Sequence, residues 1–183
     1  KLVNPKLPHK SDHGIVRLGL CDSDDIGAIS QEVVSLGSQA LGHPAGDRIL
    51  IEQMADGLIA ELLVGIQNDP HFGLVMTIAG GGTLVELMAD SVTVLLPAQP
   101  QDLANALSTL KVMKLLSGYR GRAHADLDEL VQTLMKISAM ALALADTLID
   151  MDINPLWVTE HGSIAVDALI RLDDIDALPA HLC

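Results

Sequence analysis

The C-terminal part of the chain carries the stretch DINPLWVTEHGSIAVD, residues 152–167. Alternating apolar side chains predict a β-hairpin here, with one strand at Leu156–Val158 and its partner at Ser163–Val166. A four-residue loop joins the two strands. In that register Asn154 lies directly opposite Asp167, which makes the pair the first candidate site.

Directly opposite residues on antiparallel strands have Cβ atoms about 5 Å apart. An Asn carbonyl oxygen and an Asp carboxylate at that separation can share one hard cation, and Mg²⁺ completes its shell with water and phosphate oxygens. Asp152 lies on the same face as Asn154, two residues before it. A one-residue slip would spoil this geometry. The competing interpretation is an Asn-Pro turn followed by a solvated Asp167.

The rest of the chain mixes short strands with few helices, which favours an α+β fold over a doubly wound parallel sheet. A turn at Asp56-Gly57 is expected to join two of the strands. The expected strands are 14–20, 48–54, 58–66, 73–78, 91–96 and 147–153. The expected helices begin near 22–25, 101 and 126 and end near 38, 116 and 145.

Composition excludes some classes of protein. The chain has 183 residues with 11 Lys+Arg against 24 Asp+Glu, a net charge of −13, which argues against nucleic-acid and anionic-membrane surfaces. At 49% hydrophobic residues the chain is expected to fold. Two cysteines make no disulfide scaffold, so we expect a reducing, cytoplasmic location. The longest uncharged stretch, 70–85, is too short and glycine-rich to span a bilayer.

Three further segments have both a functional and an ordinary interpretation. Ala79–Glu86 contains three consecutive glycines, whose backbone can cradle phosphate, or it is a plain strand connection. His9 lies in a polar loop and is either a phosphate acceptor or an ordinary loop residue. Tyr119–Arg122 offers two arginines that either clamp phosphate oxygens or face solvent.

Taken in order, these segments resemble the ATP-grasp domain of NDP-forming (ADP-forming) acyl-CoA synthetases. The resemblance runs from Lys1 to about Arg171. The segments that carry it are His9–Asp12, Glu61–Gly65, Asp69-Pro70, Phe72-Gly73, Gly81–Glu86, Gly118–Gly121, Asp152–Pro155 and Asp167. The last two also resemble the magnesium site of the related succinyl-CoA synthetase β subunit.

The resemblance implies an α+β ATP-grasp fold in which nucleotide lies between two lobes. It also implies that the fold is incomplete at its N-terminal side, so we expect the chain to be a piece of a larger protein. On this interpretation residues 1–46 are the remainder of the first lobe, 47–171 are the second lobe and 172–183 are a tail.

Site residues follow from the same resemblance. Asn154 and Asp167 match magnesium positions, and Asp152 matches an acidic position that meets the phosphohistidine of a partner domain. His9 matches a histidine implicated in carrying phosphate between active sites. The residues matched to nucleotide binding are Lys1, Glu52, Glu61, Gly81, Gly82, Glu86 and Arg120.

The implied activity is an ADP-forming acid–thiol ligase. ATP and Mg²⁺ phosphorylate a histidine, the phosphate activates a carboxylic acid, and CoA takes the acyl group. CoA and the phosphohistidine would bind or lie on other domains of the same enzyme, and the enzyme is a candidate homo-oligomer. Ile15 and Ala79 depart from the family pattern, where glycines are usual. They favour the alternative, a non-catalytic module of a multidomain protein lysine acetyltransferase.

Overall fold

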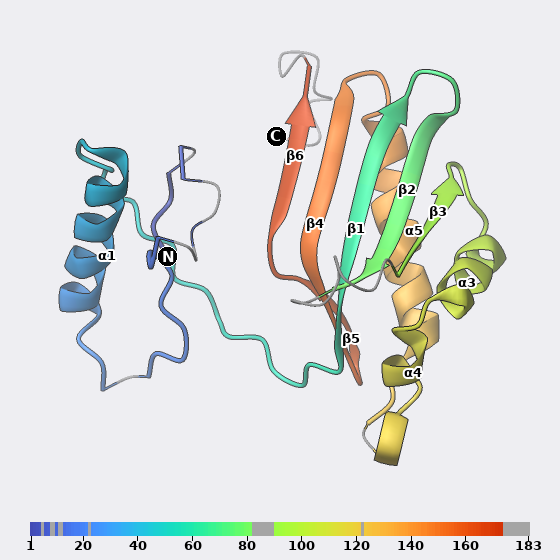
Figure 1. Cartoon of the computed structure of the whole chain (residues 1–183), viewed down its shortest axis with the longest axis horizontal. Helices are drawn as coiled ribbons and strands as arrows, with labels where there is room; N and C mark the ends of the chain where they lie inside the picture. The colour runs from blue at the N-terminus through green and yellow to red at the C-terminus, as the bar shows by residue number, and fades with distance from the viewer. Residues whose placement is uncertain are drawn as a thin grey trace. The chain divides into compact units, whose positions relative to one another are not determined.

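The structure is a computed structural model, and its contacts divide the chain into two compact units, Lys1–Met54 and Ala55–Cys183 (Figure 1). Each unit is described by itself. The predicted lobe limits at 46 and 171 stay a prediction. The described residues are 1–183 without Pro5, Pro8, His9, Ser11, Asp12, Asp22, 82–89, Arg122 and 174–183.

The first unit is built on helix α1, Ile26–Leu41. Its N-cap is Asp25, whose carboxylate accepts a hydrogen bond from the Ala28 backbone at 2.9 Å. Gly42 ends the helix in the left-handed conformation, at φ 70°. The predicted helix is therefore confirmed, with its C-terminus three residues beyond the expected one.

Helix α1 packs on a small apolar cluster. The buried members of this cluster are Leu2, Leu7, Ile15, Val33 and Ala45. Gly37 lies inside the helix, where a Cβ would stand 2.3 Å from Leu2 Cδ2. Only glycine lets Leu2 approach the helix this closely.

Two strands expected in the first unit, 14–20 and 48–54, are wrong. The only pairing there among the described residues is an isolated bridge between Leu2 and Ile49. Leu18 and Ile51 are 72% and 71% exposed, so these apolar side chains are not buried against a sheet. The hairpin expected at Asp56-Gly57 is wrong for the same reason, because a strand exists only beside a ladder partner.

The second unit is a six-stranded antiparallel sheet in the order β3-β2-β1-β4-β5, with β6 also paired to β4. The strands are β1 Ala60–Asp69, β2 Gly73–Gly80, β3 Ser91–Leu95, β4 Leu148–Thr159, β5 Gly162–Ala165 and β6 Ala168–Leu172. Figure 1 shows helix α5 lying along one face of this sheet. The predicted α+β class is confirmed.

The helices of the second unit follow β3 in the sequence. They are α3 Pro100–Thr109, α4 Met113–Leu116, the short 3-10 helix η1 Tyr119–Gly121 and α5 Leu127–Ala143. The single helix expected over 101–116 is therefore divided. Asp90 explains the division, because its carboxylate accepts hydrogen bonds from the backbones of Lys111 at 2.7 Å and Val112 at 2.9 Å. These bonds cap a new helical turn.

Among the described residues of the second unit, helices pack on one face of the sheet and none packs on the other. On β1, Leu62, Val64 and Ile66 are fully buried in the core with residues of α3 and α5. Because side chains alternate along a strand, the Glu61 side chain points the other way, toward the side on which Gly65 also lies. We call that second side the open face; on β4 it carries Asp150, Asp152, Asn154 and Trp157.

Among the described residues, no helix is both long enough and apolar enough to cross a membrane.

We expect Gly37→Ala to destabilise the first unit, although alanine favours helices more than glycine does. The added methyl overlaps Leu2, and overpacking of this kind costs about 1–3 kcal/mol. Ser35→Ala, on an exposed position of the same helix, serves as the control and should leave stability nearly unchanged. Thermal denaturation followed by circular dichroism measures both. An equal or higher melting temperature for Gly37→Ala would contradict the close approach.

Candidate functional site

The hairpin register predicted from the sequence is confirmed. Val158 pairs with Ser163, and the same register continues to Asn154, whose backbone N–H donates to the Asp167 carbonyl at 3.1 Å. Asn154 and Asp167 are therefore directly opposite and share the open face. The loop is tighter than expected, because residues 159 and 162 are themselves paired.

A β-bulge sets the position of Asn154. Leu62 of β1 pairs with Leu156 of β4, whereas Val64 pairs with Ile153, so β4 carries one extra residue at Asn154-Pro155. The proline has no N–H for the ladder, so the sequence tolerates a bulge at this point. Bulges of this kind re-aim side chains next to functional sites.

Carboxylates surround this bulge. Burial raises the pKa of Asp152, and the nearby charges of Asp150 and Asp167 raise it further. Asp150 is compensated, because Arg171 donates to its carboxylate through Nε at 2.8 Å and also through Nη2. This contact holds the pKa of Asp150 below its ordinary value. In the part of the chain that the structure describes, Asp152 and Asp167 form no ion pair.

The donor set at the bulge fits a hard cation. The amide oxygen of Asn154 and the carboxylates of Asp167 and Asp152 are oxygen ligands, the type that Mg²⁺ prefers. The described residues contain no group of three or more His, Cys, Asp or Glu able to hold a metal. A cation here would therefore rely on one or two carboxylates and take its other ligands from water or phosphate.

A second contact on the open face involves Glu61, the cross-strand partner of Trp157. The Trp157 indole donates from Nε1 to Glu61 Oε1 at 3.1 Å. Gly81 N–H donates to the Glu61 carbonyl at 2.6 Å, and a Cβ on Gly81 would stand 2.6 Å from Glu61 Cβ. The structure thus brings together two predicted nucleotide-binding residues, Glu61 and Gly81.

The C-terminal end of the connection between β2 and β3 is anchored by Asp90. Asp90 accepts a hydrogen bond at its carbonyl from Gly80 N–H at 3.0 Å, and its carboxylate caps α4. Gly81 and Asp90 therefore fix both ends of the connection between β2 and β3. The predicted residues Gly82 and Glu86 lie outside the described residues.

Two other predicted residues meet in the first unit. Lys1 Nζ lies 2.7 Å from Glu52 Oε2, with the lysine side chain 19% and the glutamate side chain 49% exposed. The ion pair joins residues matched separately to nucleotide binding.

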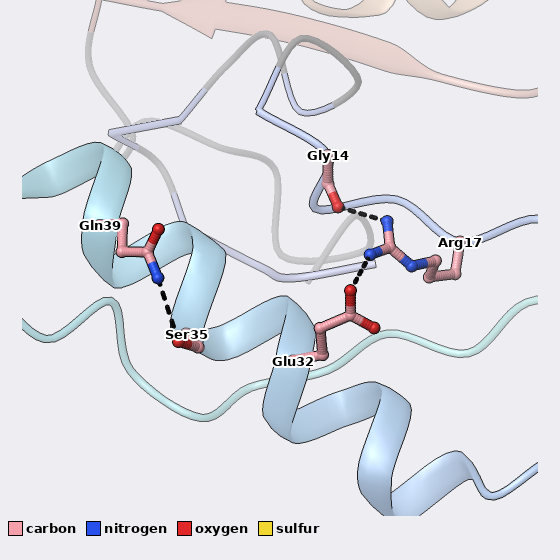
Figure 2. Close-up of polar contacts among 5 residues, drawn as sticks. All are labelled: Gly14, Arg17, Glu32, Ser35 and Gln39. Atoms are coloured by element: carbon pink, nitrogen blue, oxygen red, sulfur yellow. Dashed lines mark hydrogen bonds and ion pairs between the residues drawn. The ribbon is translucent and has the colours of Figure 1, made fainter.

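His9 lies outside the described residues, but the residues on either side of it are well anchored. Leu7 and Ile15 are buried in the same cluster, and Ile15 N–H donates to the Lys10 carbonyl at 3.2 Å. Arg17 donates to the Gly14 carbonyl at 2.7 Å and forms an ion pair with Glu32 of α1 at 2.6 Å (Figure 2). The chain after His9 is thereby tied to α1.

Arg120 is not joined to these groups. Its backbone is left-handed, at φ 58°, and its guanidinium carbon lies 5.2 Å from the ring centre of Tyr119. Within the described residues no hydrogen bond or ion pair links it to the open face.

Sequence reasoning missed Trp157 and the Asp150–Arg171 pair. Trp157 meets Glu61 across the sheet, 96 residues away in the sequence. The signal that would have found Arg171 was present, because the hairpin register, carried on along β4, places it opposite Asp150.

Comparisons with known proteins identify the family of this chain. A family model described as an ATP-grasp domain matches residues 1–172. An ADP-forming acetate–CoA ligase of Archaeoglobus fulgidus is 32% identical over 91% of this chain and 24% of that protein. The β subunit of an ADP-forming acetate–CoA ligase of Pyrococcus furiosus is 29% identical over 94% of this chain and 73% of that subunit.

A solved structure is also similar. It is an acetyl-coenzyme A synthetase of Candidatus Korarchaeum cryptofilum in complex with coenzyme A and Mg-AMPPCP, with its phosphohistidine segment pointing towards the nucleotide binding site. The two chains are 28% identical with a TM-score of 0.78, over 94% of this chain and 74% of the other.

The chain thus spans about a quarter of the single-chain ligase and about three quarters of the separate β subunit. It is homologous to the β subunits and corresponding domains of ADP-forming acyl-CoA synthetases. Since the family model covers nearly the whole chain and the structural neighbour shares its fold, this chain belongs to the ATP-grasp domain family.

Proposed function

We propose that this chain binds Mg·ATP as the ATP-grasp part of an ADP-forming acyl-CoA synthetase. The overall reaction converts acid, CoA and ATP into acyl-CoA, ADP and phosphate through a phosphohistidine. The observation that carries the proposal is the opposition of Asn154 and Asp167 beside the β4 bulge. The Mg-AMPPCP in the Korarchaeum structure supports it, since AMPPCP is an analogue of ATP.

On this proposal Asn154 and Asp167 hold the magnesium ion through their side-chain oxygens. The ion would supply neutralisation of the phosphate charges, which is the main requirement of phosphoryl transfer. Asp152 faces the histidine that receives the phosphoryl group. Burial, and then the charges of Asp150 and Asp167, raise the pKa of Asp152, and a bound magnesium ion would offset the repulsion among these carboxylates.

The nucleotide would lie along the open face and the glycine-rich segment. Glu61 and Gly81 are in contact there. The other residues assigned to nucleotide binding are Gly82, Glu86 and Arg120 of the second unit and Lys1 and Glu52 of the first. Of these, Lys1 and Glu52 form an ion pair of their own, which nucleotide binding would have to accommodate.

The remaining steps belong to other parts of the enzyme. CoA, the carboxylic acid and the phosphohistidine would be held by other domains or subunits, and His9 would carry phosphate toward them. A homo-oligomeric, cytoplasmic enzyme is part of this proposal. The relatives described above are ligases, so they give no support to the alternative of a non-catalytic module in a lysine acetyltransferase.

In the full-length enzyme, Asp167→Asn should weaken Mg·ATP use by at least about tenfold, and more than Asn154→Ala does. Asp167 supplies the only full charge of the pair, and added Mg²⁺ should restore part of the loss. The measurement is the KM for ATP at varied Mg²⁺. Asp146→Asn, the same charge change at an exposed position, is the control. Equal KM values for Asp167→Asn and Asp146→Asn would refute the assignment.

Asp152→Asn should raise the melting temperature at pH 7, because it removes a charge that burial and the two neighbouring carboxylates disfavour. The increase should be only about 1–2 °C, because solvent screens much of this effect. The folded-state pKa of Asp152 lies above its ordinary value of 3.8, so its ionised form destabilises the fold. That penalty disappears as pH falls through the raised pKa. The difference between variant and wild type should therefore shrink from pH 7 to pH 4 in thermal denaturation. A difference that grows as pH falls would contradict a destabilising charge at Asp152.

His9→Ala should abolish overall turnover in the full-length enzyme while leaving ATP affinity within about twofold of the wild type, because the role proposed for His9 is carrying phosphate. Turnover is measured as acyl-CoA formation, and affinity by calorimetric titration with AMPPCP. The matched control is His13→Ala, an exposed histidine in the same segment. Normal turnover by His9→Ala would leave His9 as an ordinary loop residue.

A further inference from the structure

Trp157 is the single tryptophan of the chain, and it stands on the open face of β4. Its sequence neighbours Leu156 and Val158 are 1% and 0% exposed and belong to the core. Trp157 itself is only half-buried. Its side chain therefore points toward the side of the sheet where the candidate ligands lie.

The indole does more than cover the sheet. Its N–H donates to Glu61 Oε1 at 3.1 Å, across the β1–β4 ladder. The backbone of Glu61 in turn receives Gly81 N–H at 2.6 Å. A continuous chain of contacts thus runs from the start of the glycine-rich segment, through Glu61, to the strand that carries Asn154.

The type of donor matters. An indole N–H is neutral, so it orients the Glu61 carboxylate and leaves its negative charge in place. A lysine or arginine partner would neutralise that charge. Within the described residues no hydrogen bond reaches the second oxygen, Oε2. Trp157 therefore fixes the direction of the carboxylate and leaves one oxygen available to a hydrogen-bond donor of a ligand.

We propose that Trp157 is a positioning residue for nucleotide binding, acting through Glu61. It fixes the position of the Glu61 carboxylate, and of the adjoining Gly81 backbone, relative to the Asn154–Asp167 pair. This inference rests on the proposed function, because it takes Mg·ATP as the ligand of the open face. A purely structural role would need the bulk of the side chain and not its N–H.

The test separates the two roles in the full-length enzyme. Trp157→Phe keeps an aromatic ring and loses the donor, so the KM for Mg·ATP should rise about three- to tenfold with kcat little changed. Trp157→His keeps an N–H, because imidazole Nε2 superposes on indole Nε1, and it loses the larger ring. Its KM should stay nearer to the wild-type value. The opposite order of the two variants would overturn the proposal.

A double-mutant cycle tests whether Trp157 acts through Glu61. Glu61→Ala should raise KM on its own, and adding Trp157→Phe to it should cause no further rise. If the KM increases of the two single variants multiply in the double variant, the coupling through Glu61 is overturned.

Thermal denaturation verifies that each variant folds. If Trp157→Phe does not fold, Trp157→His decides, and a tenfold rise in the KM of Trp157→His would overturn the proposal. Titration with AMPPCP separates failure of the proposed function from failure of the proposed role of Trp157. If the wild type does not bind AMPPCP, both proposals are overturned. If Trp157→Phe binds it as tightly as the wild type, only the role of Trp157 is overturned.

Discussion

The pairing of strand β4 is the constraint on which the rest of the second unit depends. β4 pairs with β1 on one side and with β5 and β6 on the other. Met151 and Ile153 turn into the core at 1% and 3% exposure, whereas Asp152 and Asn154 turn to the open face. A one-residue slip would exchange these two sets. The burial that stabilises the sheet therefore also holds the candidate ligands in place.

The features that depend on short-range chemistry were predicted well. Helices α1 and α5 begin directly after Asp25 and Asp126, whose side chains cap them. Strands β2 and β3 coincide with the apolar runs expected at 73–78 and 91–96, which are bounded by turn residues. The expectations that failed needed knowledge of distant neighbours. No local pattern shows that Asp90 divides a helix near Val112.

The candidate site divides in the same way. Asn154 and Asp167 belong to one hairpin, so turn length and alternation were enough to place them opposite each other. Glu61 and Trp157 meet only because β1 and β4 pair, and no spacing rule connects residues so far apart. The roles of the predicted site residues stay proposals, since a shared face shows proximity and not chemistry.

The tight turn of the β4–β5 hairpin has a consequence for evolutionary change in chain length. Extra residues between Thr159 and Gly162 would lengthen the connection and leave the ladder beyond it intact. One extra residue between Gly162 and Asp167 would instead rotate the aspartate to the helix-covered face. Insertions and deletions compatible with this site are therefore restricted to the tip of the hairpin, and the spacing between the tip and Asp167 should vary less than the tip itself.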